Sequence, residues 1–195
     1  MPTRLTLRIE LLAMRDEGSA VRDKLLQAGE LGDGCHPEME AVHERHTARM
    51  REILAQYDWP TRQLVGVDGE EAAWLIVQHA IGDPELQRQA LPLLEQAATA
   101  GEAPSWQAAY LCDLIAYFEG RPQRYGTQLD TGADGYIDVY QLEDPAGVDQ
   151  LRTAVGLGPL ERPARDGQTP RPVEEVAAHR ANFAAWVQAV GWRRQ

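Results

Sequence analysis

Lysine is nearly absent from this sequence, in which Lys24 stands alone against eighteen arginines. Enzymes that form a Schiff base need a lysine amine, so the sequence argues against that chemistry. Cysteine is also scarce, because Cys35 and Cys112 are the only two and lie far apart without a Cys-x-x-Cys spacing. Zinc ribbons and thioredoxin-like redox motifs need that spacing, and both are therefore excluded.

Basic runs and long apolar runs are missing as well. The formal charge of −11 and the lack of clustered cations argue against a nucleic-acid partner, which needs cations to displace phosphate counterions. No apolar run approaches the roughly 18 residues of a membrane span, and the N-terminus resembles an amphipathic helix more than a leader. Phosphate-binding glycine loops and a Gly-x-Ser-x-Gly elbow are also absent. We expect a soluble, cytoplasmic protein with no cofactor and no membrane partner.

Helical periodicity accounts for most of the chain. At 195 residues and 44% hydrophobic, the chain is long enough for one compact domain with a full core. Apolar spacing together with Pro, Gly and Asp punctuation predicts five helices, with a turn-rich connection over 61–69 and Asp68 as a cap. Their ranges are 3–28, 37 to about 59, 70–81, 85–100 and 105–119.

After the fifth helix the pattern changes. Short, partly β-branched and aromatic segments at 123–129 and 136–141 flank a turn-forming stretch, which predicts a hairpin over 123–141. A short helix over 145–156, a Pro/Arg/Gly-rich linker and an amphipathic helix from Val173 follow. The predicted fold is a mainly α, single-domain helical bundle with one small β-hairpin. It comprises a core domain (1–160), a linker (161–172) and a C-terminal helix (173–195) that packs on the core or extends it.

Two histidines lie one turn apart on the apolar face of the second helix. His43 and His46, with Glu40 one turn earlier, form a single Glu-x-x-His element, whereas di-iron bundle proteins use two. A mononuclear metal site of His43, His46 and His79 is geometrically allowed. The alternative is that both helix-two histidines are packed and hydrogen-bonded to backbone or carboxylate groups.

The third helix carries a glutamine and a histidine within an apolar run. Gln78 and His79 point about 100° apart around the helix axis, and Trp74 shares the face of Gln78. A neutral imidazole at His79 could act as general acid or base, because its unperturbed pKa lies near 6.5. The alternative is that both polar side chains only tie the helix to neighbouring loops.

A second polar set surrounds the predicted hairpin. Asp113 lies within an apolar helix, so we expect it to meet an arginine, a histidine or a helix end, and pairing with His79 would orient that imidazole. Uncharged donors and acceptors follow the fifth helix and suit a polar small molecule. They are Gln123, Tyr125, Thr127 and Gln128. The alternative for this set is an edge strand pinned by side-chain hydrogen bonds.

Four patches of the sequence resemble a bacterial, largely actinobacterial, domain family of unknown function. The resemblance spans roughly residues 11–160 and implies no established reaction, cofactor or partner. The patches are Tyr57-Asp58-Trp59-Pro60 with Leu64-Val65-Gly66, Ala72-Ala73-Trp74-Leu75 with Gln78-His79-Ala80, Ala109-Tyr110-Leu111 with Asp113, and Glu119-Gly120-Arg121-Pro122-Gln123 with Tyr125-Gly126-Thr127-Gln128.

Two functions of different class fit these observations. The first is a small-molecule enzyme, such as a biosynthetic tailoring enzyme, with His79 as acid/base group and Asp113 as its orienting partner in a pocket formed by the third and fifth helices and the hairpin. Its substrate-binding residues would be Trp74, Gln78, His46, Gln123, Tyr125, Thr127 and Gln128. The second is a non-catalytic ligand-binding or protein-interaction module in which the same residues are structural. A homodimer is compatible with both.

Overall fold

The computed structural model of the chain describes residues 4–30 and 36–193. Thr3, where the first helix was expected to begin, and Cys35 lie outside the described residues. Seven helices and one two-stranded antiparallel hairpin within these ranges confirm the mainly helical fold class. The chain divides into two compact units, residues 1–103 and 104–195, which are described separately. The domain boundary expected at residue 160 stays a prediction.

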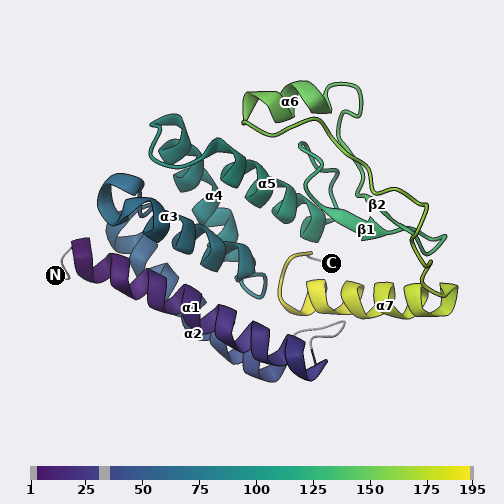
Figure 1. Ribbon diagram of the computed structural model, residues 1–195, viewed down its shortest axis with the longest axis horizontal. Coiled ribbons are helices and arrows are strands. Elements are labelled where there is room, and N and C mark those ends of the chain that lie inside the picture. Colours follow the sequence, from purple (N-terminus) through teal and green to yellow (C-terminus); the bar gives the residue numbers. More distant parts are fainter. Residues whose placement is uncertain (1–3, 31–35, 194–195) are drawn as a thin grey trace. The chain divides into compact units, whose positions relative to one another are not determined.

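The first unit is a bundle of four helices: α1 (Arg4–Ala28), α2 (Pro37–Tyr57), α3 (Arg62–His79) and α4 (Pro84–Thr99). Helices α1 and α2 lie side by side, and both contact α3 (Figure 1). The core is aliphatic and includes the fully buried side chains of Leu7, Leu11, Leu25, Met50 and Ile53. Burying each such side chain contributes about 1.5–3 kcal/mol, so this core supplies most of what holds the four helices together.

Caps fix the starts of α2 and α4 where the sequence predicts them. His36 precedes Pro37, and its Nδ1 accepts a hydrogen bond from the Glu38 amide at 3.2 Å. Asp83 precedes Pro84, and its carboxylate accepts from the Leu86 amide at 3.1 Å. Proline suits the first helical turn, because the N–H that it lacks has no intrahelical partner there.

The predicted connection over 61–69 is wrong, because α3 already begins at Arg62. Gly66 interrupts the helix with φ 78° and ψ 171°, a backbone conformation that favours glycine. Asp68 follows the interruption and accepts a hydrogen bond from the Gly69 amide at 2.9 Å, while Arg8 of α1 pairs with the same carboxylate at 2.6 Å. Asp68 therefore lies inside the kinked helix, paired with Arg8, and its role as a helix cap stays a prediction.

The second unit contains α5 (Ser105–Glu119), β1 (Leu129–Thr131), β2 (Ile137–Val139), α6 (Val148–Ala154) and α7 (Val173–Ala189). The strands pair antiparallel with Leu129 opposite Val139 and Thr131 opposite Ile137. Both strands are shorter than predicted. Residues 123–128 form a loop with one isolated bridge, and residues 155–172 contain neither helix nor strand.

Helix α5 ends at the predicted glycine. Gly120 adopts φ 74°, the left-handed conformation that closes many helices. Arg193, beyond α7, donates from Nε to the Phe118 carbonyl at 2.9 Å and so satisfies one of the free carbonyls of the helix end. Phe118 stacks on Trp192 at 5.1 Å and on Phe183 at 5.9 Å, so aromatic contacts hold α7 against α5 (Figure 1).

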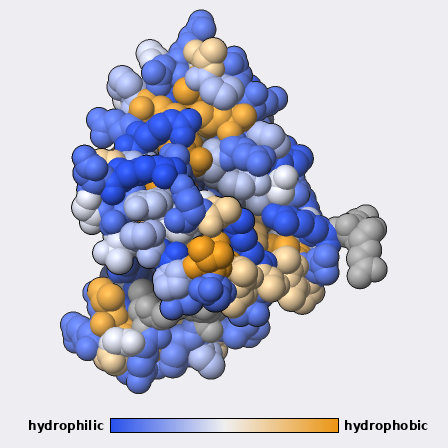
Figure 2. Space-filling model, turned by 90° about the vertical axis from the view of Figure 1, so that its right-hand side faces the viewer, coloured by the Kyte–Doolittle hydropathy of each residue, from blue (hydrophilic) through white to orange (hydrophobic). Residues whose placement is uncertain are grey.

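Hydrophilic residues dominate the face of the molecule drawn in Figure 2, with small hydrophobic areas between them. The exposed large hydrophobic side chains of the second unit include Leu129, Ile137 and Val173. Among the described helices, none is both long enough and apolar enough to cross a membrane.

Candidate functional site

Two imidazole rings stack in the first unit. His79 is the last residue of α3, and the centroid of its ring lies 5.4 Å from the ring centroid of His43 on α2, with an interplanar angle of 14°. Desolvation by the atoms around it, and next the positive charge of Arg22, lower the pKa of His79 below 6.5, although part of its surface is exposed. Burial, with the neighbouring histidines, lowers the pKa of His43 to about 4. Both rings are therefore neutral at pH 7.

The third histidine is held by a carboxylate. His46 is buried, and its Nε2 lies 2.9 Å from Oε2 of Glu17 on α1. The hydrogen bonds from His46 and from Arg45 lower the pKa of Glu17. This contact matches the packed, carboxylate-bonded alternative for His46, whose substrate-binding role stays a prediction. The described residues contain no group of three or more His, Cys, Asp or Glu side chains placed to hold a metal ion, so the three-histidine site is not assembled there.

The position of His79 depends on groups that the sequence patterns did not single out. Gln87 of α4 is fully buried and donates from Nε2 to the Val77 carbonyl at 2.7 Å and to the Gln78 carbonyl at 3.3 Å. Arg51 of α2 pairs with Asp83, just beyond α3, at 2.7 Å. A glutamine in the first turns of a helix that follows Gly-Asp-Pro could have been noticed as a partner for the preceding helix end.

The polar side chains of α3 have different environments. Trp74 and Gln78 are half-buried. Within the described residues, Nε2 of Gln78 is buried without a hydrogen-bond partner. An unsatisfied buried donor costs about 1–3 kcal/mol, and a ligand acceptor that bonded to this amide would remove that cost. The ligand-binding roles of Trp74 and Gln78 stay predictions.

In the second unit, Asp113 is fully buried and organises the loop after α5. Its Oδ1 accepts from the Arg124 amide at 2.8 Å and the Tyr125 amide at 3.1 Å. Its Oδ2 accepts from the Thr127 amide at 3.0 Å and from the Thr127 hydroxyl at 3.1 Å. These contacts belong to residues 124–127, so the orienting role of Asp113 toward His79 stays a prediction.

Gln123 forms a second set of contacts within the same loop. It is fully buried, and its Nε2 donates to the Gln128 and Tyr140 carbonyls, each at 2.9 Å. Its Oε1 accepts from the Gln128 amide at 2.8 Å. The Gln128 side chain in turn donates to Oγ1 of Thr127 at 3.0 Å. The structure thus brings together the polar residues that the sequence grouped around Asp113, and backbone groups occupy several of their donors and acceptors.

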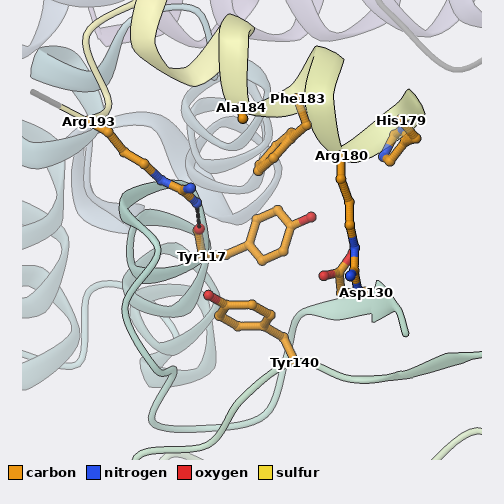
Figure 3. A pocket seen from close by; sticks show the side chains of 8 residues that line it. All are labelled: Tyr117, Asp130, Tyr140, His179, Arg180, Phe183, Ala184 and Arg193. Carbon is orange, nitrogen blue, oxygen red and sulfur yellow. Dashed lines mark hydrogen bonds between the residues drawn. The ribbon is translucent and has the colours of Figure 1, made fainter. Parts of the chain in front are cut away.

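A cavity of about 180 Å³ lies elsewhere in the second unit. Aromatic rings from α5, the strand β2 region and α7 face it, and Arg180 reaches from α7 toward Asp130 of β1 (Figure 3). Burial, and next the charge of Asp130, raise the pKa of Tyr117 to about 12. The cavity is lined by Tyr117, Asp130, Tyr140, His179, Arg180, Phe183, Ala184 and Arg193.

None of these lining residues was predicted from the sequence as a site residue. They come from separated segments, and α7 completes the cavity only after it packs on α5. The aromatic and basic residues near the middle of α7, namely His179, Arg180 and Phe183, were the available signal. The sequence alone gave no reason to place them beside Tyr117.

A model of DUF6624, a family of unknown function, matches residues 5–167. The matched range holds α1–α6 and the hairpin, and it ends before α7. This match confirms the resemblance to an uncharacterised domain family. No curated protein and no solved structure matches the chain.

Proposed function

Because the chain belongs to the DUF6624 family, for which no function is established, we propose a function from its own residues: a small-molecule enzyme that uses the imidazole of His79 for acid/base chemistry on a polar substrate. The observation that carries this proposal is the stack of His43 and His79, in which both rings have lowered pKa values and His79 keeps an exposed surface.

The lowered pKa gives His79 a defined part in proton transfer. At neutral pH one ring nitrogen carries a lone pair and can accept a proton from a substrate hydroxyl, an amine or an acidic C–H group. The positive charge of Arg22 and the desolvated surroundings disfavour the imidazolium that forms, so the ring returns the proton readily to the product. His43, with its pKa of about 4, stays neutral and does not compete for that proton.

The neighbouring residues of α3 support substrate binding. The buried Nε2 of Gln78 offers a donor to a substrate oxygen, and Trp74 offers an aromatic surface one turn earlier. Gln87 and the pair Arg51–Asp83 hold this end of the helix in place. Hydrolysis, isomerisation and cyclisation by proton transfer all fit this group of side chains.

A comparison of wild type with His79→Gln tests the proposal. Both proteins are incubated with a defined mixture of polar metabolites, and substrate loss and product formation are followed by mass spectrometry. General acid/base catalysis contributes typically 10²–10⁴-fold. We therefore expect wild type to convert a substrate and the variant to convert it at least about 100-fold more slowly. His36→Gln is the matched control, since His36 caps α2 away from the stack, and it should convert at the wild-type rate. Equal rates for wild type and His79→Gln would contradict the proposal.

A second candidate is a non-catalytic ligand-binding or protein-interaction module. The observation that favours it is the use of Asp113 and Gln123 by backbone groups of the 124–128 loop. If this candidate holds, a metabolite of the same mixture binds to wild type but is recovered unchanged.

A further inference from the structure

The cavity beside α7 has the size of a single-ring ligand. Its volume is about 180 Å³. An engineered apolar cavity of about 150 Å³ holds benzene, so one six-membered ring with a small substituent fits here. The cavity is also independent of the histidine stack, because its lining residues all belong to the second unit.

Three aromatic side chains give the cavity flat apolar walls. Tyr117 meets Tyr140 edge-to-face at 4.9 Å and Phe183 at 5.4 Å with a tilt of 44°. Figure 3 shows the three rings in a row, with Tyr117 between Phe183 and Tyr140 and with Arg180 and Asp130 to one side. Aromatic rings prefer offset or edge-to-face partners at 4.5–7 Å, and a planar ring lying beside this row would find such partners.

Cations outnumber anions around this space. Arg180 and Arg193 line it together with a single carboxylate, Asp130, in a chain whose net charge is −11. Arg180 donates from Nη2 to the Thr131 carbonyl at 2.9 Å, and Arg193 donates from Nε and Nη2 to carbonyls of α5. A guanidinium has five N–H donors, and these bonds hold each group while others stay available to an anion. Arginine matches carboxylates through paired hydrogen bonds.

Asp130 limits the ligand to one negative group. It lies opposite Asp138 in the hairpin register, and Asp138 is paired with Arg162 at 3.0 Å. Its own carboxylate lines the cavity and would repel a second anionic substituent.

We propose that this cavity binds a small aromatic monocarboxylate, with its ring against the row of Tyr117, Tyr140 and Phe183 and its carboxylate at Arg180. Helix α7 lies outside the range that the family model matches, so part of this site comes from residues beyond that range. Binding there does not require His79.

The test uses the full chain and sodium benzoate, titrated by protein-observed NMR at constant ionic strength. A nine-atom ligand supports a dissociation constant of about 1 mM at ordinary ligand efficiency. We expect saturable binding of that order, weakened about tenfold in Arg180→Gln, which loses the charge-assisted contact. Ala184→Phe, which fills the cavity from an exposed position on α7, should abolish binding.

Two controls separate this site from general effects. Arg165→Gln removes an exposed arginine of the same unit that pairs with Asp134, and it should bind benzoate as wild type does. Benzylamine, which has the ring but the opposite charge, should bind at least tenfold more weakly than benzoate. The proposal is overturned if wild type shows no saturable benzoate binding, if both α7 variants bind like wild type, or if benzylamine binds as tightly. Near-ultraviolet circular dichroism of each variant shows whether α7 still packs.

Discussion

Replacement of Asp113 by alanine should lower the free energy of unfolding by about 3–5 kcal/mol, the range for removal of one member of a buried charged network. The carboxylate accepts hydrogen bonds from three backbone amides and one hydroxyl of residues 124–127, and it is fully buried. Without it these four donors lose the buried acceptor that they share. Urea unfolding at pH 7, followed by circular dichroism, measures the change.

Two further variants define the cause of that loss. Asp113→Asn keeps one carbonyl oxygen but places an amide N–H₂ against backbone donors, so we expect roughly half of the alanine effect. Asp166→Ala removes an exposed acid from the same unit and should change the free energy by less than about 0.5 kcal/mol. A change below about 1 kcal/mol for Asp113→Ala would show that the 124–127 loop does not depend on this carboxylate.

Gln123→Leu should lower the free energy of unfolding by about 2–4 kcal/mol, because leucine has a similar volume but no polar atoms. The side chain of Gln123 donates to the carbonyls of Gln128 and Tyr140 and accepts from the amide of Gln128. Each buried backbone group left without a partner costs about 1–3 kcal/mol. The measurement is the same urea titration. An equal dependence of the free energy of unfolding on urea concentration in wild type and variant shows that the unfolded state is unchanged.

Gln128→Leu is the matched control for this prediction. Its side chain is only half-buried and makes one hydrogen bond, to Oγ1 of Thr127, so we expect a loss below about 1 kcal/mol. Equal losses for the two glutamine variants would contradict the central position assigned to Gln123. Both residues were candidate ligand contacts from the sequence, and the pair of variants separates structural from ligand-binding use.

Local signals in the sequence were sufficient for most helix ends. A capping residue followed by proline fixes the start of α2 and of α4, and Gly120 ends α5 with a positive φ. The start of α3 was misplaced because Gly66 and Asp68 are typical of a turn, whereas here Gly66 forms a kink and Asp68 follows it within the same helix. Such a kink depends on contacts with α1, through Arg8, that no local pattern contains.

The loop over 123–128 shows why the hairpin was predicted too long. Its residues have strand-like composition, but the amides of Arg124, Tyr125 and Thr127 donate to Asp113 rather than to a neighbouring strand. The sequence correctly grouped Asp113 with the residues that follow α5. It could not indicate that a carboxylate would take the place of a strand partner, because that depends on the packing of α5 against the loop.

The histidine stack was only partly visible in the sequence. Spacing placed His43 on the packed side of α2 and His79 at the end of α3, but the ring contact requires two helices to meet at a particular turn. Likewise, the influence of Arg22 on His79 comes from α1 and has no sequence signature.

The most direct test of acid/base chemistry at His79 is an NMR titration of the histidine rings from pH 3 to 8, with signals assigned through His43→Gln and His79→Gln. We expect the midpoint of His79 below 6.5 and that of His43 near 4. Arg22→Gln should move the midpoint of His79 upward, because it removes a nearby positive charge. A midpoint for His79 above 6.5 would contradict a readily available neutral imidazole at this site, and a midpoint that does not respond to Arg22→Gln would contradict the contribution of Arg22 to it.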